Sequence, residues 1–174
     1  MSEEGMNPGN PGRSSPVSIA LTMLARVATV IAGASLVGMA VVEGWQVFAR
    51  YVLNDSPSWT EPVALLLMST VMMVGAAVGT RNDAHFGFFI AVEHTPPGVR
   101  RILLAIARLI AAAVGLMLSI WGGRLLVDGW SVPMAGAPLP QGIVFLPFCV
   151  GGALIVVFAI ERLITSPLSR TTHE

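Results

Sequence analysis

The few ionisable side chains of this chain lie mostly outside its long apolar stretches. Glu43 is the acid nearest to the middle of such a stretch. A carboxylate inside a membrane could carry protons, as in a small proton-coupled exporter. Glu43 is close to one end of its stretch, however, and Arg50 follows two helical turns later. An acid at the membrane interface, close to Arg50, is therefore the simpler interpretation.

The histidines and the single cysteine form no pattern typical of a metal, haem or nucleophilic site. His85, His94 and His173 lie outside the apolar stretches, whereas a haem-holding membrane anchor needs histidines inside its helices. Cys149 has no partner for a disulfide or a cysteine-based metal site within one chain. The sequence also contains no HExxH motif and no glycine-rich phosphate loop. We expect no enzyme activity, no cofactor and no metal site.

The composition indicates an integral membrane protein. Of the 174 residues, 54% are hydrophobic and 11% are charged, and the mean hydropathy is +0.74. A soluble domain carries about 25% charged residues, so this chain could not cover a water-exposed surface. Ten basic residues balance ten acidic ones without a basic run, which excludes a nucleic-acid-binding protein. The partner of most of the surface is therefore the lipid bilayer.

Four apolar stretches are long enough for helices that cross a bilayer, which takes roughly 20 residues each. Their approximate limits are 17–48, 62–80, 102–127 and 142–161. None alternates like a barrel strand. The first is too long, and its polar leader too extended, for a cleaved signal peptide. The sequence predicts an all-α membrane domain of four transmembrane helices over residues 17–165.

Shorter segments surround and interrupt this domain. Residues 1–16 are rich in Pro, Gly and Ser and are predicted to form a disordered tail, and residues 166–174 a second short tail. Residues 84–92 are apolar but far too short to span, so an interfacial segment is predicted between the second and third helices. Arginines favour one side of the membrane: eight lie on the side of both tails, and only Arg50 and Arg124 lie opposite. Both termini are therefore predicted to be cytoplasmic.

Small residues recur on helix faces, where they allow helices to approach closely in lipid. In the third stretch they appear every four residues, at Ala107, Ala111, Gly115, Ser119 and Gly123. The second stretch contains Gly75 and Gly79, four residues apart, and the first contains Ala34 and Gly38. These faces could pack the four helices together or could contact another protein. The sequence does not separate the two uses.

The loops next to the second stretch carry a more specific pattern. An Arg-Tyr pair follows the first stretch, a Ser-Trp-x-Glu segment opens the second, and an arginine precedes a histidine by four residues at its end. The residues are Arg50, Tyr51, Ser58, Trp59, Glu61, Arg81 and His85. Over residues 20–165 the chain resembles the small membrane subunit of tripartite ATP-independent periplasmic (TRAP) transporters, the DctQ-like family. It departs from that family's pattern where Pro62 and Phe86–Phe89 stand in place of common acids.

The resemblance implies a small permease subunit in the bacterial inner membrane. Such a subunit supports a large membrane subunit that carries the solute and ion sites, while a periplasmic solute-binding protein delivers the solute. It further implies uptake of a carboxylate-type solute driven by a sodium or other ion gradient, with the seven motif residues at the subunit interface. Two alternatives remain: a stand-alone proton-coupled exporter that uses Glu43, and a membrane anchor of a redox complex.

Local physical chemistry predicts three contacts. Ser58 and Glu61 have the spacing of a capping box, with Pro62 in the first helical turn. Arg50 and Glu61 lie on the same side of the membrane and could form a pair that fixes the loop carrying Trp59. Glu161 is expected to pair with Arg108 or Arg26, which lie at similar depth.

Overall fold

The computed structural model describes residues 16–81 and 97–165, apart from the side chains of a few residues at the ends of these ranges. Helix α1 spans Pro16–Tyr51, α2 spans Thr60–Arg81, α4 spans Pro97–Asp128 and α5 spans Leu146–Thr165. A short 3-10 helix, η1, covers Gln141–Phe145 directly before α5. Within the described ranges the extended structure is limited to an isolated bridge between Pro133 and Pro140. The predicted all-α class is confirmed.

All four predicted spans lie in helices that are long and apolar enough to cross a membrane. The first helix is much longer than a bilayer requires, because its 36 residues extend over about 54 Å. The fourth predicted span is not a single α-helix: residues 142–145 belong to η1. Pro147, the second residue of α5, has no amide hydrogen to continue an α-helical ladder from η1, so the regular helix begins anew at Leu146.

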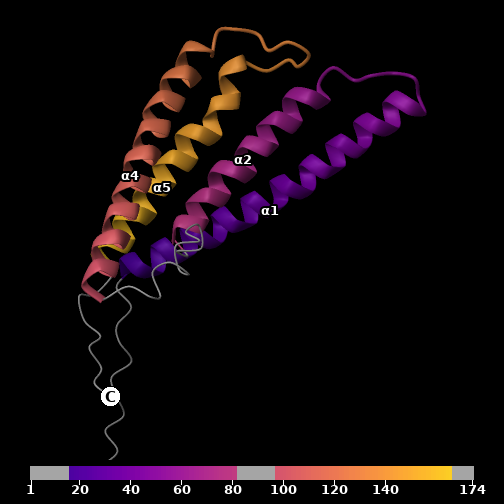
Figure 1. Cartoon of the computed structure of the whole chain (residues 1–174). Coiled ribbons are helices and arrows are strands. Elements are labelled where there is room, and N and C mark those ends of the chain that lie inside the picture. Colours follow the sequence, from indigo (N-terminus) through magenta and orange to yellow (C-terminus); the bar gives the residue numbers. More distant parts are fainter. Residues whose placement is uncertain (1–15, 82–96, 166–174) are drawn as a thin grey trace, which may run out of the picture.

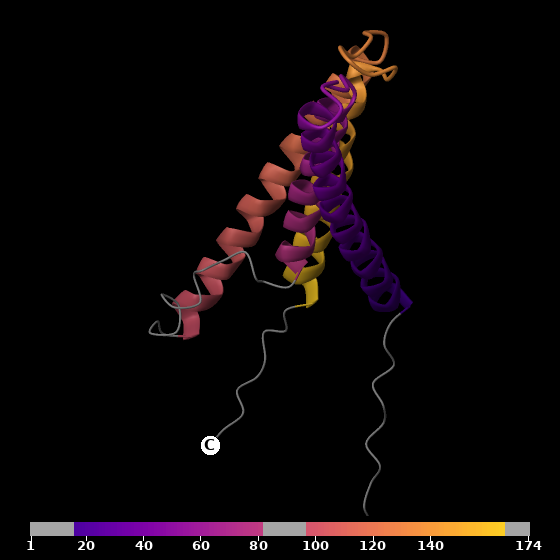
Figure 2. The same ribbon diagram turned by 90° about the vertical axis from the view of Figure 1, so that its right-hand side faces the viewer.

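The helices form a row rather than a closed bundle. Helix α2 packs between α1 and α5, and α5 packs between α2 and α4. Figure 1 shows α4 and α5 side by side, while α1 crosses α2 obliquely and diverges from the rest; Figure 2 shows the splay from the side. The outer helices, α1 and α4, therefore each present a broad surface with no helical neighbour among the described residues.

The loops and the helix termini lie at two opposite ends of the row of helices. The 52–59 and 129–140 segments lie together at one end, which we call the loop end. The start of α1 and the close of α2 and α5 lie at the opposite end, which we call the Arg81 end.

The buried core lies where α1, α2 and α5 meet. Its members are small or flexible side chains around one large ring: Ala25, Met73, Ala77, Ile155 and Phe158. Phe158 and Ala77 have no exposed surface. Most large apolar side chains of α1 and α4 are instead exposed, which suits helices surrounded by lipid.

Some predicted features fall outside the described ranges. These are His85, the interfacial segment 84–92, the tail predicted over residues 1–16 (apart from Pro16) and the tail over residues 166–174. They stay predictions.

Candidate functional site

An ion pair at the Arg81 end joins three helices. Arg81 is the last residue of α2, and its Nε and Nη2 atoms donate to the two carboxylate oxygens of Glu161 on α5, over 3.0 and 3.2 Å. Nη2 also donates to the hydroxyl of Thr22 on α1 over 2.9 Å. Only 19% of the Arg81 side chain and 12% of the Glu161 side chain are exposed. This bidentate geometry is the strong form of a carboxylate–guanidinium pair.

Backbone carbonyls near the ends of α2 and α5 extend this network to α4. The Nε atom of Arg162 donates to the carbonyl oxygen of Arg81. The Nη1 atom of Arg108, on α4, donates to the carbonyl oxygen of Arg162 over 3.0 Å. Carbonyls at a helix C-terminus have no partner inside their own helix, so side-chain donors stabilise them. We call Thr22, Arg81, Arg108, Glu161 and Arg162 the Arg81 cluster; it connects all four helices.

The predicted partner of Glu161 is wrong. The carboxylate pairs with Arg81 instead of Arg108 or Arg26. Arg81 reaches it because α2 lies between α1 and α5, an order of helices that the sequence does not specify. The guanidinium also lies 5.8 Å from the centre of the Phe158 ring, close enough for a cation–π contact.

At the loop end, a hydrogen bond holds the two connecting segments together. The Ser58 hydroxyl donates to the carbonyl oxygen of Gly136 over 3.0 Å. Gly136 has a φ of +87°, and a Cβ atom there would overlap the backbone carbonyl of Ser58. Only glycine satisfies both the backbone conformation and the close approach. The loop between α4 and η1 is thus fixed against the start of α2.

The predicted capping box is not formed. Helix α2 begins at Thr60, and the Ser58 hydroxyl is used in the contact with Gly136. The hydroxyl of Thr60 donates to the carbonyl oxygen of Pro57 over 2.9 Å. Pro62 does lie in the first turn of α2, as predicted.

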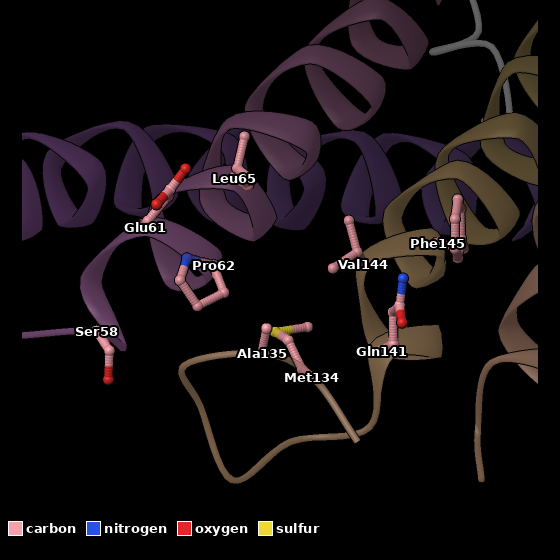
Figure 3. A pocket seen from close by; sticks show the side chains of 9 residues that line it. All are labelled: Ser58, Glu61, Pro62, Leu65, Met134, Ala135, Gln141, Val144 and Phe145. Atoms are coloured by element: carbon pink, nitrogen blue, oxygen red, sulfur yellow. The ribbon is translucent and has the colours of Figure 1, made fainter. Parts of the chain in front are cut away.

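A groove lies at the loop end, between the start of α2 and the segment that connects α4 to η1 (Figure 3). Its volume is about 430 Å³, and its walls come from the start of α2, the 134–135 segment and η1. The polar lining residues are Ser58, Glu61 and Gln141, and the others are mainly apolar. The groove therefore combines one carboxylate with apolar walls.

The motif residues around this groove are exposed. Arg50, Tyr51, Ser58, Trp59 and Glu61 all lie at the surface. No ion pair joins Arg50 to Glu61 within the described ranges, so the predicted pair that would fix the loop is absent from this structure. The loop is held by the contact between Ser58 and Gly136 instead.

The small-residue stripe of α4 lies against α5. A Cβ atom at Gly115 would be 2.9 Å from the carbonyl oxygen of Gly152, and one at Gly152 would be 2.6 Å from the carbonyl oxygen of Gly115. The Ser119 hydroxyl donates to the carbonyl oxygen of Cys149 over 3.0 Å, and a Cβ atom at Gly123 would lie 3.6 Å from the Cys149 Sγ atom. Ala107 and Ala111 are half-buried.

Sequence reasoning missed the glycines that complete this contact. Gly122 lies against the backbone of Cys149, and Gly129 lies against Gly142. The Gly151-Gly152 pair in α5 was the available signal, since two adjacent glycines allow close approach on two sides; Gly151 packs against Met73 of α2.

The glycines predicted for packing in α2 behave differently. A Cβ atom at Gly75 would meet no atom within 4 Å. Gly79 is half-buried.

The sequence matches a known protein family over most of its length. Residues 39–167 match the family model described as the DctQ component of tripartite ATP-independent periplasmic transporters. The chain belongs to the DctQ family. All the predicted motif residues, from Arg50 to His85, and the pair of Arg81 with Glu161 lie within the matched range.

Two curated relatives come from Vibrio cholerae serotype O1. The sialic acid TRAP transporter small permease protein SiaQ is 28% identical over 113 residues, covering 60% of this chain and 65% of the relative. The C4-dicarboxylate TRAP transporter small permease protein DctQ is 26% identical over 77 residues, covering 43% of this chain and 33% of the relative. The chain thus spans less than two thirds of the length of either relative.

Family membership and the four apolar helices together identify a multi-pass membrane protein, a small permease subunit of the TRAP type. The family consists of transporter subunits rather than enzymes.

Proposed function

We propose that this DctQ-family chain is a structural scaffold for a large, ion-coupled membrane subunit. In this proposal the complex takes up a carboxylate-type solute that a periplasmic binding protein delivers, and this chain itself has no catalytic role. The names of the two Vibrio cholerae relatives, one for sialic acid and one for C4-dicarboxylates, support a carboxylate-bearing solute.

The observation that carries this proposal is that the charged side chains of the Arg81 cluster contact other parts of the same chain. Glu161, Arg81, Arg108 and Arg162 bind one another or the chain's own backbone. A solute or ion site would need ionisable groups that face a cavity within the membrane. Here these groups fasten α1, α2, α4 and α5 together, which is what a rigid supporting subunit requires.

The alternative of a stand-alone exporter requires Glu43 to line a path between helices. Glu43 is exposed on α1, an outer helix of the row. A carboxylate in that position cannot pass protons through the interior of this chain. The family match is to transporter components, so it does not support the alternative of a membrane anchor for a redox complex.

We further propose that the Arg81 end faces the cytoplasm and the loop end faces the periplasm. The arginine bias of the described residues supports this orientation. Arg81, Arg108 and Arg162 belong to the Arg81 cluster, and Arg26 is one helical turn from Thr22 of that cluster. Among the described residues, only Arg50 and Arg124 lie in the helix ends that lead into the loop end. The exposed motif residues and the groove would then face the periplasm, where a binding protein could reach them.

Cysteine labelling tests this orientation. Single cysteines at Ser14, Ser56 and Ser131, each in a Cys149→Ser background, are treated with a membrane-impermeant maleimide on intact spheroplasts. We expect the cysteines introduced at positions 56 and 131 to react on intact spheroplasts. The cysteine introduced at position 14 should react only after the membrane is permeabilised. Reaction at Ser14 with protection of the other two would reverse the proposed topology.

Purification from native membranes tests the assignment of the partner. An affinity tag on this chain should recover a large multi-span subunit in a fixed ratio, identified by mass spectrometry. Recovery of the tagged chain alone, under detergents that keep it folded, would contradict the scaffold proposal.

A further inference from the structure

The Arg81 cluster sets one common level for all four helices. Arg81 of α2 donates to the Thr22 hydroxyl of α1 and to the Glu161 carboxylate of α5. Arg108 of α4 donates to the carbonyl oxygen of Arg162, the residue after Glu161. These contacts align the helices to within the reach of one arginine side chain, or roughly one helical turn. Distances along each helix can therefore be counted from the same starting level.

Each helix reaches a second charged or amide side chain at the same distance from this level. The separations are 20 or 21 positions, from the cluster member of each helical segment to Glu43, Glu61, Asp128 and Gln141. Twenty helical residues extend over about 30 Å, which is the thickness of the hydrocarbon core of a bilayer. The charged residues in between are Arg26 and Arg124, each four positions from one end of its stretch. We call the level of these four residues the second level.

Three helical segments stop at the second level, whereas α1 continues past it. Helix α2 begins one residue before Glu61, α4 ends at Asp128 and η1 begins at Gln141. Helix α1 runs on for eight more residues, to Tyr51, or about 12 Å. In Figure 1 the end of α1 lies farther from the Arg81 end than the start of α2 does. We call residues 44–51 the α1 overhang.

Tryptophans mark the second level independently of the helix lengths. Three of the four, Trp45, Trp59 and Trp130, lie two positions from a residue of this level, on the side away from the Arg81 cluster. Their exposed fractions are 45%, 42% and 60%. Tryptophan is enriched in the headgroup layer just outside the hydrocarbon. The tryptophans thus place the hydrocarbon boundary where the counted helix lengths place it.

The side chains of the α1 overhang suit the headgroup layer better than water or hydrocarbon. Trp45, Val47, Phe48 and Tyr51 are all at least 45% exposed, and the rings of Trp45 and Phe48 lie 5.9 Å apart. So much exposed apolar surface is unfavourable in water, while the exposed Arg50 beside it is costly in hydrocarbon. The headgroup layer is about 5–8 Å thick on each side. Because α1 is oblique to α2 (Figure 1), the overhang rises by less than its length.

We propose that the hydrocarbon ends at the second level on the loop-end side and that the α1 overhang lies in the layer of phospholipid headgroups, where its aromatic rings anchor the helix. The inference concerns how the chain sits in the bilayer and does not depend on the scaffold role. It accounts for the excess length of α1, since the last two turns lie outside the hydrocarbon. It also places the carboxylates of Glu43 and Glu61 at the boundary, where water can hydrate them.

The distribution of the tryptophans favours lipid over a protein as the cover of these side chains. Trp45 belongs to α1 and Trp130 directly follows α4, and these two helices lie at opposite ends of the row. Trp59 precedes α2, between them. A partner protein on one side of the row would leave part of this set uncovered, whereas headgroups surround the chain at this level.

Fluorescence quenching by brominated phospholipids tests the depth of Trp45. The other three tryptophans are replaced by phenylalanine, and the full chain is placed in vesicles whose acyl chains carry bromine either near the headgroup or near the methyl end. We expect the shallow bromine to quench Trp45 at least about twice as strongly as the deep bromine. Stronger quenching by the deep bromine, or quenching by neither lipid, would overturn the inference.

The matched control carries its tryptophan in the middle of the same helix. It combines Val30→Trp with Trp45→Phe, and position 30 is exposed by 69%. The deep bromine should quench this variant more strongly than the shallow one, because position 30 is about 12 Å from Thr22 along the helix, well inside the hydrocarbon. The same bromine preference at positions 30 and 45 would contradict the proposed boundary.

Photocrosslinking in cells keeps all four tryptophans and the natural surroundings of the chain. p-Benzoylphenylalanine replaces Phe48, so that one aromatic side chain of the overhang takes the place of another. We expect the main ultraviolet-dependent adduct to add the mass of one phospholipid to this chain. An adduct with a protein in higher yield would overturn the inference, because a partner would then cover the overhang.

Discussion

Gly115→Leu is expected to lower the midpoint of thermal unfolding in detergent by about 10 °C or more and to make the protein polydisperse. A Cβ atom at this position would already lie 2.8 Å from the Cγ2 atom of Ile155 and 2.9 Å from the carbonyl oxygen of Gly152. A backbone atom cannot rotate away, so α4 and α5 must separate. Overpacking by extra methylenes typically costs about 1–3 kcal/mol and sometimes more; because leucine adds four heavy atoms against a rigid backbone, we expect at least about 4 kcal/mol here. Each kcal/mol shifts the midpoint by about 2–4 °C in a chain of this size, which gives the expected shift.

Gly75→Leu is the matched control for this substitution. It makes the same chemical change in a neighbouring helix, at a position where an added Cβ atom meets nothing within 4 Å. It should leave the midpoint unchanged or raise it slightly, because leucine favours helix more than glycine by up to about 1 kcal/mol. Equal loss of stability in the two variants would show that the contact between α4 and α5 is not the tight one described.

Glu161→Ala is expected to have the second largest effect. It removes the carboxylate that binds Arg81 in two places and leaves a mostly buried guanidinium with the Thr22 hydroxyl. Breaking a buried pair in this way costs about 3–5 kcal/mol; because both side chains keep some exposure, we expect about 3 kcal/mol. Thermal unfolding in detergent should show a midpoint lower by about 6–12 °C.

Arg26→Ala provides the control at the same end of the molecule. Arg26 is exposed and takes part in no ion pair recorded within the described ranges, so its removal should change the midpoint by less than about 2 °C. A double-mutant cycle with Arg81→Ala and Glu161→Ala should then give a coupling energy of at least about 1 kcal/mol. Strict additivity of the two losses would mean that the pair does not fasten the helices.

The positions of the spans could be read from the sequence because hydropathy and length decide them. Every predicted span lies within a helical region of the structure. The sequence does not show that the last span begins as a 3-10 helix, Gln141–Phe145, before the α-helix starts at Leu146; Pro147, inside an otherwise apolar run, is the residue that accompanies this change. The packing face at Gly115 and Ser119 could also be predicted from the sequence, because small residues spaced four apart in a membrane helix typically mark a close contact between helices.

The contacts between helices could not be read in the same way. Arg81 and Glu161 are 80 positions apart, and their pairing depends on α2 lying between α1 and α5, an order that hydropathy does not encode. Ser58 shows a second limit: its spacing to Glu61 fits a local cap, but a more distant partner, Gly136, accepts its hydrogen bond. Tertiary contacts overrode local patterns at both ends of the molecule.

Uptake into reconstituted vesicles, with the subunits supplied separately and together, tests the scaffold role most directly. With an ion gradient and the binding protein present, vesicles that contain this chain alone should accumulate no solute, whereas vesicles that contain both membrane subunits should concentrate it. When the large subunit and binding protein are exchanged for those of another transporter of this type, the preferred solute should change with them. Concentrative, solute-specific uptake by this chain without a large subunit would contradict the account.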